Sequence, residues 1–161
     1  MGVPMQRIGA ILAGPADFPG WRAQARRLLA AGVPPEAVEW RVAGEAPGLF
    51  AEADVPDTVT AGPPPTVPRA FVDLSETAVR HRDPEHFALL YRVLWRLTHG
   101  EPALARVATD PDVARLEAMA KAVRRDAHKM HAFVRFRRID RKSGSAGMPR
   151  PTRKSRMPSS A

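Results

Sequence analysis

The sequence has no cysteine among its 161 residues and only one tyrosine. The absence of cysteine excludes disulfides, thiolate nucleophiles and thiolate metal ligands together, and it fits a reducing compartment. The apolar run at residues 8–13 is too short for a signal peptide or a membrane-spanning helix. Gln6 stands where a myristoylation signal would have serine or threonine. We therefore expect a cytoplasmic protein without a membrane anchor.

Positive charge is abundant but unevenly distributed along the chain. The formal net charge is +8 at pH 7, yet residues 1–140 carry 19 basic and 17 acidic side chains, a net of only +2. Residues 141–161 contain the other basic residues, no acidic residue, and mostly serine, glycine and proline besides. Such a composition cannot bury enough apolar surface to fold alone. We expect a disordered basic tail that either binds phosphate backbones without sequence preference or is simply solvated.

Local patterns in the first part of the chain predict two strands around a helix. Residues 6–13 and residues 38–42 favour short strands, with Trp40 on the buried side of the second. Asp17 is a suitable N-cap for the helix between them, and Gly32 is suited to its end. The many prolines of residues 44–68 indicate a connector without regular structure.

The second part of the chain predicts helices. Residues 69–80 form one candidate, and the pairs Asp83-Pro84 and Asp110-Pro111 each resemble the start of another. An apolar stripe marks the last helix: Val113, Leu116, Ala120, Val123, Ala127 and Met130. The β-branched and aromatic residues at 132–139 favour a strand after it. The predicted fold is α+β: one mainly helical domain over residues 1–140 with a small sheet, followed by the tail at 141–161.

Basic residues gather between positions 121 and 138 and predict a nucleic-acid-binding surface. On a helix turning about 100° per residue, four of them fall within one arc away from the apolar stripe, namely Lys121, Arg124, Arg125 and His128. Arg135 and Arg137 share a face of the predicted strand. Phe133 and Phe136 would add stacking with nucleic-acid bases if their rings are exposed. The alternative is that both phenylalanine rings lie in the core and that the basic side chains form a solvated face without a ligand. The candidate phosphate-binding residues are Lys121, Arg124, Arg125, His128, Lys129, Arg135 and Arg137.

Catalytic signatures are weak. His128 and His131 are spaced so that both could reach one metal on a continuing helix, but only Asp126 is near as a third ligand, and it would point elsewhere. Asp126 is better suited to an ion pair with neighbouring basic residues. The segment Gly-Pro-Pro-Pro at 62–65 cannot cradle a phosphate, and no G-x-S-x-G sequence occurs. We expect no metal and no cofactor, and we keep these three residues as weak acid–base candidates.

Several segments resemble a bacterial family of DNA-metabolism or DNA-repair proteins. Two matching blocks lie in the first part of the chain: DFPGWR at residues 17–22, followed by residues 25–26, and residues 32–40. Three lie in the second part: HRDP at residues 81–84, followed by residues 87 and 90–91, then LWRL at residues 94–97, and finally residues 123–136. The last block is long and unusual, and it contains Arg124, Arg125, Asp126, His128, Lys129, His131 and Arg135. The resemblance spans residues 6–139, about one domain.

This resemblance implies DNA metabolism by association, since the family's own activity is unassigned. Its members form a domain often clustered or fused with a uracil-DNA glycosylase of the X type, or neighbouring a radical-SAM protein. Family members continue with further strands containing a Trp-Phe-Glu-Pro-type segment, whereas Lys142 begins a low-complexity tail here. The chain therefore resembles a C-terminally truncated or degenerate member.

Three functions follow as hypotheses. The favoured one is an accessory DNA-binding module in DNA repair that is associated with a uracil-DNA glycosylase and performs no catalysis by itself. The second is a nucleic-acid-processing enzyme that uses His128, His131 and Asp126. The third is an adaptor that docks a glycosylase or radical-SAM partner through the helix at residues 110–130.

Overall fold

A computed structural model describes residues 7–46, 52–55 and 63–143, and the side chains of residues 52–53 and 135–143 lie outside the description. The chain divides into two compact units, Met1–Asp126 and Ala127–Ala161. The described elements are β1 (Arg7–Leu12), α1 (Phe18–Ala30), a 3₁₀ turn (Pro35–Ala37), β2 (Val38–Val42), β3 (Glu52–Asp54), α2 (Arg69–Ala78), α3 (His86–Thr98), a 3₁₀ turn (Leu104–Arg106) and α4 (Pro111–Ser143). The predicted α+β class, mainly helical with a small sheet, is confirmed.

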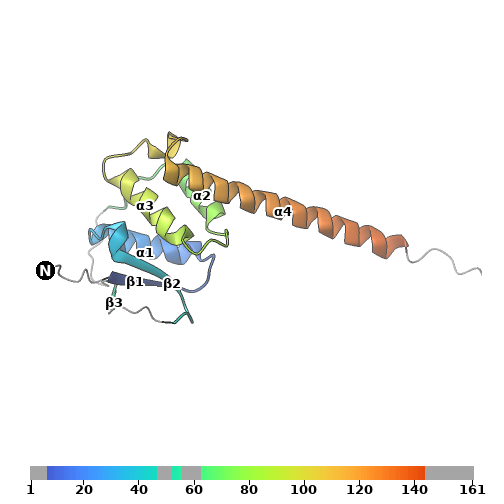
Figure 1. Cartoon of the computed structure of the whole chain (residues 1–161), viewed down its shortest axis with the longest axis horizontal. Helices are drawn as coiled ribbons and strands as arrows, with labels where there is room; N and C mark the ends of the chain where they lie inside the picture. The colour runs from blue at the N-terminus through green and yellow to red at the C-terminus, as the bar shows by residue number, and fades with distance from the viewer. Residues whose placement is uncertain (1–6, 47–51, 56–62, 144–161) are drawn as a thin grey trace, which may run out of the picture. The chain divides into compact units, whose positions relative to one another are not determined.

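The sheet of the first unit is parallel, with strand order β2-β1-β3. β1 pairs with β2 so that Ala10 lies opposite Trp40, and with β3 so that Ile8 lies opposite Ala53. Helix α1 connects β1 to β2 and packs on β1, and α3 packs on β2 from the same side of the sheet (Figure 1). Ala10 and Leu12 therefore lie in the core, whereas Ile11 on the other face is 52% exposed.

Strand β3 corrects one prediction. It lies within residues 44–68, which the prolines indicated to be a connector without regular structure. Its pairing partner β1 is more than forty residues earlier in the sequence, so the strand depends on a long-range contact and not on local propensity. Other parts of that segment, residues 47–51 and 56–62, lie outside the described residues.

Helix α1 has the ends that the sequence predicts. The Asp17 carboxylate accepts hydrogen bonds from the backbone N–H of Gly20 at 3.0 Å and of Ala13 at 3.1 Å, so it caps the helix and fixes the chain that enters it. Gly32 has a φ of +67°, a left-handed conformation that favours glycine after a helix. Trp21, together with Ala25 and Leu28, forms the buried face between these ends.

Helix α3 is the centre of the core, as its apolar composition predicts. Leu90 and Tyr91 are fully buried, and the Tyr91 hydroxyl donates to the Val33 carbonyl at 2.6 Å. Burial raises the pKa of this tyrosine. The helix begins at His86, two residues after the predicted Pro84, because Asp83 accepts from the Glu85 N–H at 2.9 Å in a preceding turn.

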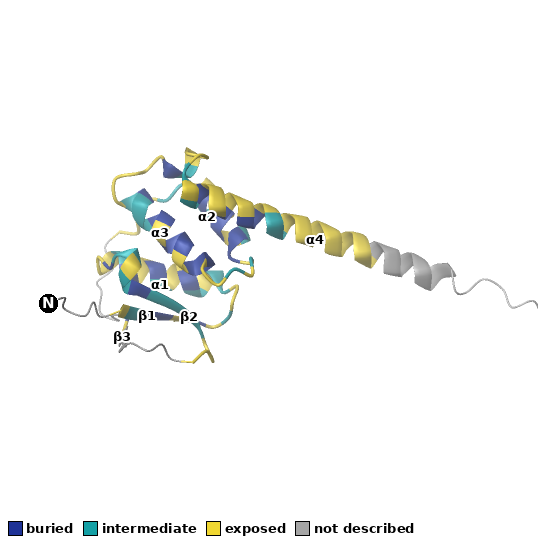
Figure 2. Cartoon of the chain, in the orientation of Figure 1, coloured by how far each residue is buried: buried dark blue, intermediate teal, exposed yellow. Residues whose placement is uncertain are grey.

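Helix α4 begins as predicted but is buried only at its start. Asp110 caps it by accepting from the N–H groups of Asp112 and Val113. Figure 2 shows buried residues confined to its first turns, where Val113, Leu116, Met119 and Ala120 contribute to the core. Val123 is half-buried, and in the second unit Ala127 and Met130 are exposed. The apolar stripe thus continues beyond the residues that the core covers.

The strand predicted for residues 132–139 is wrong, because α4 continues as a helix to Ser143. A helix satisfies its backbone hydrogen bonds within itself, whereas a strand needs a neighbouring strand. The described part of the second unit contains no neighbouring strand. The β-propensity of the phenylalanines and the valine therefore does not lead to a strand here. Helix α4 also includes residues 141–143 of the predicted tail, and the remainder of that tail lies outside the described residues.

Candidate nucleic-acid interface on helix α4

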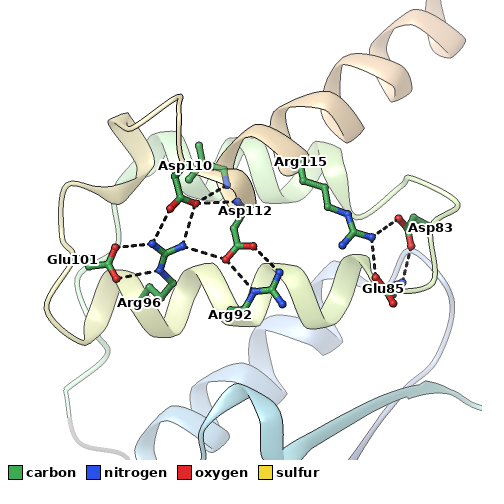
Figure 3. Close-up of polar contacts among 9 residues, drawn as sticks. Asp83, Glu85, Arg92, Arg96, Glu101, Asp110, Asp112 and Arg115 are labelled. Atoms are coloured by element: carbon green, nitrogen blue, oxygen red, sulfur yellow. Dashed lines mark hydrogen bonds and ion pairs between the residues drawn. The ribbon is translucent and has the colours of Figure 1, made fainter.

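The arginines where α3 meets the start of α4 are all paired with carboxylates (Figure 3). Arg96 of α3 contacts Asp110 and Glu101 at 2.8 Å each through Nη2, and Asp112 at 3.1 Å through Nη1. Arg92, one helical turn earlier, contacts the other Asp112 oxygen at 2.6 Å. This guanidinium pair therefore ties the N-terminal turn of α4 to α3.

A second set of ion pairs holds α4 one turn further along the helix. Arg115 donates to Asp83 at 2.9 Å and to Glu85 at 2.8 Å, both in the turn that precedes α3. Each of these two sets of ion pairs joins α4 to a segment that is distant in the sequence. Both sets therefore depend on the packing of α3 against α4. We name these residues the paired cluster: Asp83, Glu85, Arg92, Arg96, Glu101, Asp110, Asp112 and Arg115 (Figure 3).

Four members of the paired cluster have pKa values that are shifted toward their charged forms. Hydrogen bonds from Arg96, and then from the N–H groups at the start of α4, hold the pKa of Asp110 below its ordinary value. The pKa of Asp83 is lowered first by the Glu85 N–H and then by Arg115. The same contacts raise the pKa of Arg96 and Arg115. These groups are structural, and their charge is neutralised locally.

Further along α4, the first unit ends with three exposed cations, Lys121, Arg124 and Arg125. Within the part of the chain that the structure describes, no ion pair involves any of the three. Lys121 and Arg125 are four residues apart and so lie about one helical turn from each other on the same side. Their charges face solvent and are available to a ligand.

The second unit continues with exposed His128, Lys129 and His131 on α4. Among the described residues none of these three forms an ion pair, and Asp126, the predicted intrahelical partner, forms none either. The backbone of Arg135 and Arg137 is helical, but their side chains lie outside the described part. We name Lys121, Arg124, Arg125, His128 and Lys129 the unpaired basic residues.

Exposed apolar side chains accompany these cations in the second unit. Met130 is 72% exposed, Phe133 64% and Val134 59%. Phe133 thus meets the condition set for base stacking, which required an exposed ring, whereas the side chain of Phe136 is outside the described residues. Met130 and Val134 are thus apolar side chains that are mostly exposed on this short segment.

The weak catalytic candidates do not come together as a site. Asp126, His128 and His131 are all exposed on α4. No group of three or more histidine, aspartate or glutamate residues in the described ranges could hold a metal ion. A general acid or base acts in a pocket that adjusts its pKa, and these exposed positions offer no such enclosure.

The paired cluster was not predicted from the sequence. One signal for it was present, since Arg92 and Arg96 are one turn apart on an otherwise apolar helix. Charged residues in such a helix usually need partners, and the acidic residues 101, 110 and 112 follow shortly. Arg115 had no comparable signal, because its partners lie about thirty residues earlier.

The geometry defines an α+β protein whose helix α4 carries exposed lysine, arginine and histidine side chains. Residues 84–150 match the model of a domain of unknown function (DUF4130). This match covers α3, α4 and three of the resemblance blocks wholly or in part, and it leaves the block at 17–22 outside. Neither a curated protein nor a solved structure matches the chain. Among the described residues, no helix is both long and apolar enough to cross a membrane.

Proposed function

We propose that this protein is an accessory DNA-binding module whose unpaired basic residues on α4 contact backbone phosphates. The observation that carries the proposal is that, among the described residues, Lys121, Arg124 and Arg125 have no acidic partner. Arg115, near the start of the same helix, and the adjacent arginines of α3 are paired with carboxylates. A cation that is already neutralised by a carboxylate gains little from a phosphate. A solvated cation can instead exchange its counterions for the polyanion.

The charge along α4 supports a polyanionic ligand over a small acidic one. Residues 118–143 contain nine lysines and arginines but only two acidic residues, Asp126 and Asp140. Release of condensed counterions makes each phosphate contact favourable at low salt, and it makes the affinity independent of base sequence. We therefore expect binding without strong sequence preference, with Arg135 and Arg137 contributing further contacts.

DNA is proposed as the nucleic acid because of the resemblance to DNA-metabolism proteins. The long block at residues 123–136 carries that resemblance, and it contains most of the unpaired basic residues. By the same association we propose action in DNA repair beside a uracil-DNA glycosylase, with a radical-SAM protein as a further partner. The module itself performs no catalysis in this proposal, and base excision belongs to the glycosylase.

Charge reversal on α4 tests the proposal. In Arg125→Glu/Lys129→Glu we expect the affinity for labelled single- and double-stranded DNA of several sequences to fall by about tenfold or more, alike for all of them. Fluorescence anisotropy at one fixed salt concentration measures this. The matched control is Arg80→Glu/Arg106→Glu, which changes the charge equally at exposed positions outside α4. Equal affinities for the two variants would rule out the α4 surface.

A protein-docking adaptor is the second candidate, and the exposed apolar residues of the second unit favour it. Met130 is largely exposed although it continues the stripe whose first three members are buried. A partner such as a glycosylase or radical-SAM protein would cover this surface. The test is co-elution of the purified pair, with Met130→Gln as the variant expected to abolish it. A purified pair that elutes separately counts against the adaptor.

A further inference from the structure

A cavity of about 190 Å³ opens in the first unit, between α1, α2 and the segment at residues 63–67. Its walls are mostly apolar, with Trp21 from α1 and Phe71 from α2 as buried aromatic members. An apolar cavity of about 150 Å³ can hold a benzene molecule, and drug-sized ligands need about 300 Å³ or more. The cavity is thus of a size for one aromatic ring, so a larger ligand would place only its ring inside and the rest of its atoms at the mouth.

Two arginines give this cavity its charge. Arg22 and Arg26 line it from successive turns of α1, and both are exposed. The Arg22 guanidinium carbon lies 5.8 Å from the centre of the Phe18 ring, a cation–π contact that leaves its N–H groups available. Within the described part of the chain neither arginine has an ion pair, and no acidic residue lines the cavity.

One buried polar group adds to the lining. The Ser75 hydroxyl is fully buried and donates to the Phe71 carbonyl at 2.7 Å. This hydroxyl is thus engaged by the backbone of its own helix. The cavity combines aromatic walls with a cationic mouth, the distribution found in sites for small amphipathic ligands.

We propose that this cavity binds a small planar anion, with an aromatic ring against Trp21 and Phe71 and an anionic group between Arg22 and Arg26. The charge at the mouth selects an anion over a neutral ring of equal size, because guanidinium groups donate to carboxylate or phosphate oxygens. Two sources share this chemistry, a free aromatic carboxylate and the base and phosphate of a nucleotide. The proposal is independent of DNA binding by α4.

The test uses the full chain and four small probes. Benzoate and thymidine 5′-monophosphate represent the two sources, benzyl alcohol is the neutral ring, and acetate is the anion without a ring. NMR titration follows the Trp21 indole N–H, which donates to the Phe87 carbonyl at 3.2 Å beside the cavity. We expect saturable shifts with benzoate, the nucleotide or both, and affinities about tenfold weaker for benzyl alcohol and acetate.

Two variants locate the binding. Arg22→Gln/Arg26→Gln alters only exposed side chains, so it should fold normally and bind the anionic probe about tenfold more weakly. Arg80→Gln/Arg106→Gln is the charge-matched control and should bind as the unaltered protein does. Ala25→Leu places a larger side chain in the cavity wall and should abolish the shifts. The proposal is overturned if neither anionic probe binds, if the neutral ring binds equally well, or if the two arginines can be replaced without effect.

Discussion

Two groups of cations, one where α3 meets the start of α4 and one further along α4, look alike in the sequence and differ in their surroundings. At the start of α4, Arg115 and the neighbouring arginines of α3 each contact one or more carboxylates within about 3 Å. Further along, Lys121, Arg124 and Arg125 have no such partner among the described residues. The first group therefore stabilises the packing of α3 on α4, whereas the second contributes little to the fold and remains available for binding.

The difference arises from what lies opposite each group. The first turns of α4 are covered by α3 and by the turn before it, which supply Asp83 and Glu85 (Figure 3). The same turns bury Leu116 and Ala120. Burial and charge pairing are thus both found at the start of α4, and Figure 2 shows exposed residues further along the helix.

The largest expected effect on stability comes from replacing a buried apolar residue at the start of α4. Leu116→Ala should lower the free energy of unfolding by about 3 kcal/mol, because it leaves a cavity at a fully buried position. Met130→Ala removes a side chain on the same stripe but should change stability by less than about 0.5 kcal/mol. Urea unfolding followed by circular dichroism measures both. Similar losses for the two variants would mean that the second unit is packed.

Arginine substitution gives the next largest effect. Arg96→Gln removes the charge-assisted hydrogen bonds to Asp110 and Glu101, and it should cost about 2 kcal/mol of stability. The matched variant Arg124→Gln should fall within about 0.5 kcal/mol of the unaltered protein. If Arg124→Gln proves as destabilising as Arg96→Gln, the distinction between paired and unpaired cations is lost.

Acid should weaken the paired cluster, with a smaller effect than either substitution. The pKa values of Asp83 and Asp110 are lowered in the folded state, so their contribution is complete above the ordinary aspartate pKa of about 3.9. As the pH falls below about 4, the unfolded state binds more protons and the free energy of unfolding decreases. Urea unfolding at a series of pH values should show a shallower decrease for Asp110→Asn. An identical pH dependence in the variant would contradict this assignment.

The sequence predicts the elements whose signals are local. The capping residues Asp17 and Asp110 mark two helix starts correctly, and the strands at 7–12 and 38–42 agree with their patterns. Strand β3 was missed because its existence depends on a distant partner. Residues 132–139 form a helix although their β-branched and aromatic residues favour a strand, because local β-propensity does not specify a pairing strand.

The candidate site was predictable in residue identity but not in context. Exposure of Lys121, Arg124, Arg125, His128 and Lys129 follows from the helical arc. That these cations lack carboxylate partners, while Arg96 has three, could not be deduced from spacing alone, since each partner comes from another element. Nor could the cavity beside α1, because its walls come from segments that are separated in the sequence.

The salt dependence of DNA affinity tests the central claim most directly. Anisotropy titrations over a series of salt concentrations should compare the unaltered chain with one in which four residues are changed to glutamine: Lys121, Arg124, Arg125 and Lys129. The basic residues beyond position 140 are the same in both. If the unpaired basic residues contact phosphates, the slope of log K against log salt should become shallower by about three. An unchanged slope and affinity would contradict the account and assign any binding to charges outside this part of α4.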